Sequence, residues 1–141
     1  MKANNKKSNQ NNFIDFNSKK EVGNLGEDIA CLFLERKNYH IIERNYLKKW
    51  GEIDIVAVKD SILTFIEVKS VVDNGGSRGG GFRPEENVHK QKRLRLRRTI
   101  QTCMAQLGRG IDTEFLFHVV VVRMDVGRRR ARVLFLENII L

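Results

Sequence analysis

Two carboxylates lie at matched positions in the stretch GEIDIVAVKDSILTFIEVKS, residues 51–70. Apolar, β-branched runs flank Asp60–Ser61, a pattern that predicts a β-hairpin with a two-residue turn. That turn places Asp54 directly opposite Glu67, with Cβ atoms about 4.5–5.5 Å apart. Opposed carboxylates repel each other, and a cation bound between them removes the repulsion. The pattern therefore predicts a cation site on this hairpin, unless a three-residue turn shifts the register.

The same register places Glu52 opposite Lys69 and directs all four charged side chains to one face of the sheet. Both faces of the two strands are otherwise apolar, which is typical of central, covered strands whose charges need partners. A surface hairpin whose charges serve only solubility is the alternative. The uncharged face is expected to carry Ile53, Ile55, Ile66 and Val68.

The segments GEID (51–54) and FIEVK (65–69) resemble the core motif of the PD-(D/E)XK nuclease superfamily. More narrowly, residues 20–138 resemble the YraN-type family of small bacterial proteins, which is related to Holliday-junction resolvases. Two positions depart from these patterns. No proline precedes Asp54, and Val71 stands where the YraN type frequently has arginine.

The resemblance implies that Asp54 and Glu67 bind a metal ion while Lys69 serves the attacking water. Carboxylates are hard ligands that suit Mg²⁺ or Mn²⁺, and the backbone carbonyl of Val68 is a further candidate ligand. We therefore expect a metal-dependent endonuclease, most readily one that acts on structured or branched DNA. Two alternatives remain open: a nucleic-acid-binding module without cleavage, and a scaffold protein in which the acid pair is structural.

Glu27 is a further candidate for the catalytic site. A capping box at residues 18–21 predicts a helix from there to about residue 38. Glu27 borders its expected buried stripe, and the YraN type also has a Glu here, after the glycines that match Gly23 and Gly26. The alternative is a Glu that is favoured near a helix N-terminus. The stripe is expected to consist of Leu25, Ile29, Leu32 and Phe33.

Lys92 is the last candidate for catalysis. A second helix is expected from Pro84 to about Leu107, with proline and acids in its first turn. Lys92 falls on its apolar line and is therefore directed at the sheet, and the YraN type carries a Lys at the same distance after Val88. A snorkelling lysine is the alternative. The line itself consists of Leu96, Ile100, Cys103 and Leu107.

Lys and Arg number 26 against 17 Asp and Glu, a formal net charge of +9. This excess indicates a polyanionic partner, either nucleic acid or an anionic membrane, although charge alone also serves solubility. An amphipathic membrane helix is disfavoured because the apolar line of the second helix lacks aromatic residues. The candidate nucleic-acid contacts lie in a glycine-rich loop expected at residues 73–83 and in the second helix: Arg78, Arg83, Lys90, Arg93 and Arg95.

The order of predicted elements is α, β, β, β, α, β, β, with strands beside the hairpin at 40–46, 115–124 and 131–137, of which 115–124 is expected to be buried and central. This order predicts a restriction-endonuclease-like α/β sandwich, in which flanking helices cover a central mixed sheet of about five strands. The nuclease-like domain is expected at 18–141, after a polar, asparagine-rich and disordered arm at 1–17.

Single residues outside these motifs carry weaker expectations. Cys31 and Cys103 are isolated, which indicates reduced thiols in a cytoplasmic protein. No apolar run reaches the roughly 18 residues of a transmembrane helix. His118 is expected to be a core histidine, and Trp50 is expected at the core or rim rather than stacked on a base. The resemblance to resolvases also allows a homodimer.

Overall fold

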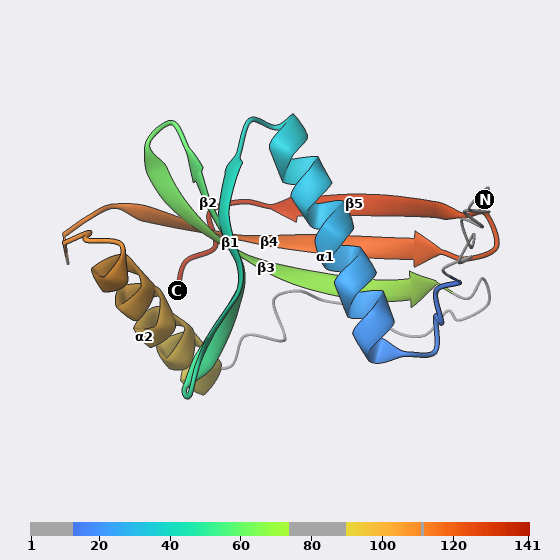
Figure 1. Ribbon diagram of the computed structural model, residues 1–141, viewed down its shortest axis with the longest axis horizontal. Coiled ribbons are helices and arrows are strands. Elements are labelled where there is room, and N and C mark those ends of the chain that lie inside the picture. Colours follow the sequence, from blue (N-terminus) through green and yellow to red (C-terminus); the bar gives the residue numbers. More distant parts are fainter. Residues whose placement is uncertain (1–12, 74–89, 111) are drawn as a thin grey trace, which may run out of the picture.

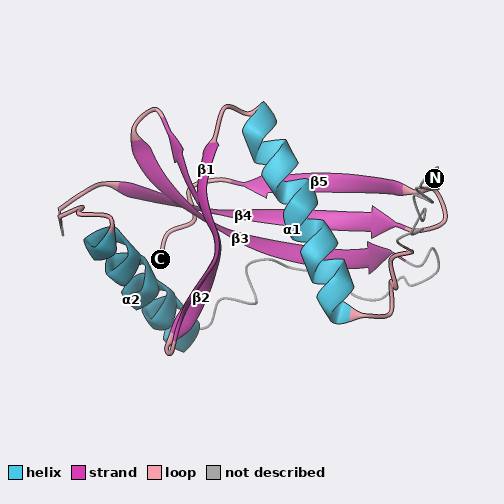
Figure 2. Ribbon diagram, viewed as in Figure 1, coloured by secondary structure: helices cyan, strands magenta, loops and turns pink. Residues whose placement is uncertain are grey.

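The computed structural model describes residues 13–73, 90–110 and 112–141. Two helices flank a five-stranded mixed sheet, so the predicted α/β sandwich is confirmed (Figure 1 and Figure 2). The domain boundary predicted at residue 18 remains a prediction, because most of the arm lies outside the described residues. The elements are α1 (Lys19–Arg36), β1 (His40–Lys48), β2 (Gly51–Lys59), β3 (Ile62–Asp73), α2 (Lys90–Gln106), β4 (Phe115–Asp125) and β5 (Arg130–Leu136).

The strands lie in the sheet in chain order, β1-β2-β3-β4-β5. Only β3 and β4 are parallel, and the other neighbours are antiparallel. Figure 1 shows β3, β4 and β5 side by side, with the β1–β2 ribbon crossing them steeply. Helix α1 packs on β3 and β4 while α2 packs on β2, so each helix covers a different part of the sheet. No helix in the described ranges is long and apolar enough to cross a membrane.

Helix α1 begins as predicted, and Leu25, Ile29 and Phe33 of its predicted stripe pack against the core. The side chain of Ser18 accepts a hydrogen bond of 3.3 Å from the backbone N–H of Glu21. The predicted stripe is wrong at Leu32, which is 56% exposed. A Cβ added to Gly26 would lie only 1.8 Å from Ser70 Oγ, so the helix approaches β3 through its small residues. The buried residues of α1 are Val22, Gly26, Glu27, Ala30, Cys31 and Leu34.

Helix α2 keeps most of its predicted apolar line. Ile100 and Cys103 are buried and Leu96 packs against the same core, whereas Leu107 lies beyond the helix end and is 40% exposed. The predicted start at Pro84 lies outside the described residues. Close packing again depends on a glycine, since a Cβ added to Gly51 would lie 2.6 Å from Oγ1 of a buried threonine of α2.

Two apolar cores occupy the two faces of the sheet, one with α1 and one with α2. Ile53 and Ile55 were predicted on one face, and this prediction is wrong: Ile55 lies in the α1 core and Ile53 in the α2 core. The side chains of the β1–β2 ribbon therefore change from one core to the other between Ile53 and Ile55. At this point Asn45 of β1 has a left-handed φ of 54°. A residue in that conformation interrupts the alternation of side chains along a strand.

Candidate active site

The hairpin that carries the acid pair has the predicted register. Ile55 pairs with Ile66, and the pairing continues without a shift to the turn. Asp60 and Ser61 have φ values of 51° and 66°, as a two-residue type I′ turn requires. The ladder ends at Ile55–Ile66, so Asp54 and Glu67 lie one position beyond its last pair.

Beyond the Ile55–Ile66 pair, the backbone of β3 bonds to a side chain of β2 and no longer to its backbone. Asp54 Oδ2 accepts the backbone N–H of Val68 at 2.7 Å, and the two strands diverge from there. We call this opening between β2 and β3 the fork. The N–H and C=O of one strand residue point toward the same neighbour, so the carbonyl of Val68 also faces the fork. The predicted Glu52–Lys69 pair is wrong because the strands have separated, and Glu52 pairs with Leu47 of β1 instead.

Two hollows meet at the fork. A cleft of about 380 Å³ on the α2 side is lined by Asp54, Glu67 and Lys69, together with Lys92 of α2. A second hollow, of about 490 Å³ on the α1 side, is lined by Glu27, with Asp54 and Lys69 again in its wall. The five residues predicted for catalysis therefore line two adjoining hollows: Asp54 and Lys69 line both, Glu67 and Lys92 only the α2 side, and Glu27 only the α1 side.

The carboxyl group of Asp54 is hard to ionise in this position. Burial raises its pKa from 3.8 to about 6, although the hydrogen bond from Val68 lowers it. The negative charges of Glu67, Glu52 and Glu27 raise it further. A carboxylate so placed is stabilised by any cation that enters the fork.

Glu67 has the opposite electrostatic environment. Its Oε1 lies 3.1 Å from Lys69 Nζ and 3.0 Å from Lys92 Nζ. Burial acts to raise the pKa of Glu67, but the two ammonium groups outweigh burial and hold the pKa below its ordinary value. The two acids of the fork thus differ. Glu67 ionises readily, whereas Asp54 ionises readily only when a cation lies beside it.

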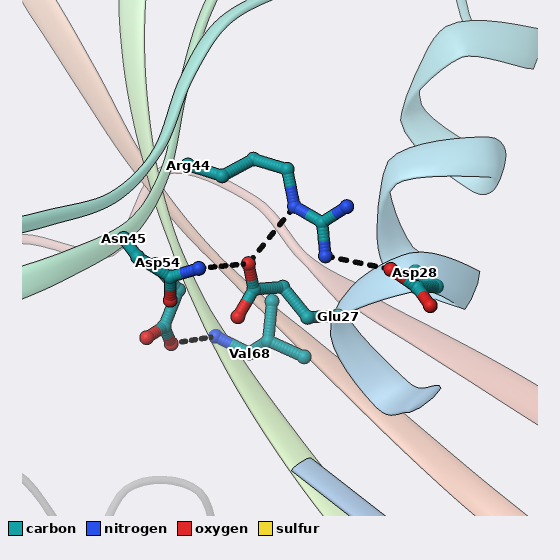
Figure 3. A network of polar contacts seen from close by, with 6 residues as sticks. All are labelled: Glu27, Asp28, Arg44, Asn45, Asp54 and Val68. Carbon is teal, nitrogen blue, oxygen red and sulfur yellow. Dashed lines mark hydrogen bonds and ion pairs between the residues drawn. The ribbon is translucent and has the colours of Figure 1, made fainter. Parts of the chain in front are cut away.

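Glu27 is held by the strand that lies beside it. Its Oε1 accepts hydrogen bonds from Arg44 Nε at 2.9 Å and from Asn45 Nδ2 at 3.0 Å (Figure 3). Arg44 also reaches Asp28 Oδ1 at 2.7 Å through Nη2. Glu27 is only 7% exposed, so these two donors stabilise a buried carboxylate.

Most of this chain is similar to a known protein family. The model of "Uncharacterised protein family UPF0102" matches residues 26–126, most of the chain. This chain belongs to the UPF0102 family. The match confirms the predicted YraN-type resemblance, because the YraN type is part of UPF0102.

Individual UPF0102 proteins are similar over nearly their whole length. One from Campylobacter jejuni subsp. doylei is 36% identical over 117 residues, which are 83% of this chain and 91% of that protein. One from Sulfurovum sp. is 39% identical over 124 residues, 86% of this chain and 96% of that protein. One from Alkaliphilus metalliredigens is 43% identical over 103 residues, 73% of this chain and 85% of that protein.

The predicted nucleic-acid contacts are only partly described. Arg95 lines the cleft on the α2 side. Lys90 and Arg93 are exposed on the same helix, and Arg78 and Arg83 lie outside the described residues.

Trp50 is half-buried and lines the α2-side cleft. The guanidinium of Arg98 stacks 4.2 Å from the centre of its ring. The exposed face of α2 therefore carries several cations close to the cleft.

Sequence reasoning missed Arg44 and Asn45. A signal was available, because asparagine is disfavoured in strands and tolerates the left-handed conformation better than most residues. An asparagine inside the predicted strand 40–46 therefore indicated an irregular strand. Its partner on α1 was not predictable from the pattern, because nothing local relates residue 45 to residue 27.

A metal ion in the fork would be coordinated by few protein side chains. Within residues 13–73, 90–110 and 112–141, no three Asp, Glu, His or Cys side chains are gathered closely enough to enclose an ion. The predicted ligands Asp54, Glu67 and the carbonyl of Val68 would therefore be completed by water or by substrate oxygens. Mg²⁺ usually keeps several waters in just such sites.

Proposed function

We propose that this protein is a metal-dependent endonuclease that hydrolyses phosphodiester bonds in nucleic acid, with structured or branched DNA as the favoured substrate. The observation that carries the proposal is the fork, where Asp54 and Glu67 line one cleft with Lys69 beside them. The resemblance of the same residues to the PD-(D/E)XK motif supports it. Membership of UPF0102 is consistent with the proposal but names no activity.

Mg²⁺ or Mn²⁺ fits the donors of the fork. Asp54, Glu67 and the carbonyl of Val68 offer only oxygen atoms, the ligands that these hard cations prefer. Burial raises the pKa of Asp54, and a divalent cation bound beside it would stabilise the ionised carboxylate. When bound, the ion would polarise a phosphate oxygen and lower the pKa of a water molecule.

Lys69 is suited to donate hydrogen bonds rather than to accept a proton. Burial acts to lower its pKa, but the charge of Glu67 outweighs burial and raises the pKa above its ordinary value. Lys69 therefore stays protonated at neutral pH, where it can orient the attacking water and stabilise the charge of the transition state. Lys92 holds the Glu67 carboxylate in place from the other side.

The exposed cations of α2 suit a polyanionic substrate. Lys90, Arg93 and Arg95 are exposed on this helix, and Arg95 reaches the cleft. Cations that bind phosphates release counterions, so the affinity should fall steeply as salt rises. We also propose a cytoplasmic location, since the buried Cys31 and Cys103 are both free thiols. A homodimer would let two forks cut two strands, and light scattering tests for it.

The proposal is tested with purified protein on branched, single-stranded and duplex DNA and on RNA, in Mg²⁺ or Mn²⁺. Asp54→Asn and Glu67→Gln should each lower cleavage at least about a hundredfold, because each removes a charged oxygen ligand. Glu35→Gln, an exposed acid of α1, is the matched control and should cleave like the wild type. Equal cleavage by the wild type and both fork variants would identify the activity as a contaminant.

One observation favours the alternative of a binding module without cleavage. Both lysines contact the same oxygen of Glu67 and so compete with an ion for it. A protein of that kind would bind DNA with a steep salt dependence and show no cleavage in Mg²⁺ or Mn²⁺. Indifference to nucleic acid and to both ions would instead indicate a scaffold.

A further inference from the structure

The two donors that hold Glu27 leave half of its carboxylate free. Arg44 Nε and Asn45 Nδ2 both bond to Oε1, and no described residue donates to Oε2. Figure 3 shows Oε2 directed toward Asp54 and Val68. The hollow on the α1 side, lined by Glu27, Asp54 and Val68, contains the space between them.

Asn45 reaches Glu27 because its backbone is in an unusual conformation. Its neighbours Arg44 and Tyr46 pair with Ile55 and Ile53, so Asn45 stands directly opposite Asp54. Its φ of 54° is left-handed, which is uncommon within a strand for any residue other than glycine. Conformations of this kind persist where the surrounding structure holds them, and they cluster at functional sites.

Arg44 ties the same carboxylate to its own helix. Its Nε bonds to Glu27 while Nη2 bonds to Asp28 on the next residue of α1. The planar guanidinium can make both contacts in one rigid geometry, which a lysine cannot. The position of the Glu27 carboxylate is thus set by two adjacent residues of β1, one of which faces Asp54 across the ribbon.

We propose that Arg44 and Asn45 are positioning residues that aim Oε2 of Glu27 into the fork, where it would hold a water molecule of the cation bound by Asp54 and Glu67. This inference rests on the proposed function, because it assumes a cation in the fork. The motif residues lie in β2 and β3, so the inference adds β1 to the site. Asp28, by contrast, only supports Arg44 from the exposed side.

The test measures Mn²⁺ affinity of the full chain by electron paramagnetic resonance, without nucleic acid. Asn45→Gly accommodates the left-handed backbone and deletes only the amide. Arg44→Lys keeps the charge and loses the fixed geometry. Each should weaken Mn²⁺ binding about tenfold, equal to about 1.4 kcal/mol. Glu35→Gln, which changes an exposed acid of α1 outside this network, is the control and should stay within about twofold of the wild type.

A double variant shows whether Asn45 acts through Glu27. Glu27→Gln removes the positioned charge, so adding Asn45→Gly to it should weaken Mn²⁺ binding no further. Wild-type affinity in both Asn45→Gly and Arg44→Lys, or additive losses in the double variant, would overturn the inference. Urea denaturation of each variant without metal checks that the fold is kept.

The outcomes also separate this inference from the proposed function. If Asp54→Asn loses Mn²⁺ binding while Asn45→Gly and Arg44→Lys keep it, only the positioning role fails. If the wild type binds no Mn²⁺, or Asp54→Asn binds it equally well, the metal site itself fails and the positioning role fails with it.

Discussion

The ammonium group of Lys92, in the first turn of α2, lies 3.0 Å from Oε1 of Glu67 in β3. The ammonium group of Lys69 lies 3.1 Å from the same oxygen. One carboxylate oxygen is thus shared by two cations, one from its own strand and one from a helix that follows much later in the chain. Helix α2 therefore packs on the sheet and also supplies one of the two cations that stabilise the Glu67 carboxylate.

Replacing Lys92 should therefore change the titration of Glu67 more than the stability of the fold. Lys92→Met is expected to raise the pKa of Glu67, because one of two compensating cations is lost. The free energy of unfolding should change by less than about 1 kcal/mol, since the Lys92 side chain is 43% exposed. Carboxyl titration by NMR and urea denaturation measure the two effects. Lys90→Met, on the same helix, is the control, and an unchanged Glu67 pKa in Lys92→Met would contradict the assignment.

Asp54→Asn should stabilise the metal-free protein above pH 6. Burial raises the pKa of Asp54 from 3.8 to about 6, so ionising it in the fold becomes unfavourable as pH rises through that window. Asparagine removes this cost, which is on the order of 2–3 kcal/mol at most. Urea denaturation in EDTA should show the variant more stable at pH 8 and the difference nearly gone at pH 4. A difference that grows toward low pH would show that burial does not raise this pKa.

Replacing either of two glycines of α1 by alanine should change the stability of the protein, in opposite directions. A Cβ at Gly26 would lie 1.8 Å from Ser70 Oγ, whereas a Cβ at Gly23 has nothing within 4 Å. Gly26→Ala should push α1 away from β3 and destabilise the protein by about 1–3 kcal/mol. Gly23→Ala should stabilise it by up to about 1 kcal/mol through helix propensity. Thermal unfolding of both variants measures this, and equal effects would mean that α1 does not approach β3 closely.

His118 should make the fold sensitive to acid. The backbone N–H of Asn138 donates to its Nδ1 at 2.9 Å, so Nε2 carries the hydrogen and donates to the hydroxyl of Tyr39 at 3.3 Å. This confirms the predicted core histidine. Burial lowers the pKa of His118 below 6.5, so its stabilising contribution is present above pH 6.5 and is lost as pH falls through the lower value in the fold.

His118→Phe isolates that contribution. At pH 7.5 the variant should be less stable by about 1–3 kcal/mol, because Tyr39 and Asn138 lose a buried partner. Toward pH 5 the difference from the wild type should shrink, since the variant cannot titrate. Urea denaturation from pH 5 to 8 measures it. If the stability difference between the variant and the wild type did not depend on pH, the pKa of His118 would not be lowered in the fold.

Local patterns determined much of this site in advance. The hairpin, its turn at Asp60–Ser61 and the register as far as Ile55–Ile66 were all predictable, because a two-residue turn sets the register of the strands that it joins. The start of α1 was predictable too, because Ser18 caps its own helix. These features depend on residues close together in the chain.

Only the tertiary structure decided how the acids are used. The ladder stops at Ile55–Ile66, and the left-handed Asn45 turns the ribbon from one core to the other. The approach of α1 to β3 through Gly26 buries Glu27, which a hydrophobic pattern would not place inside. Such features arise from packing between segments far apart in the chain, where steric fit and the need to pair buried charges override local propensity.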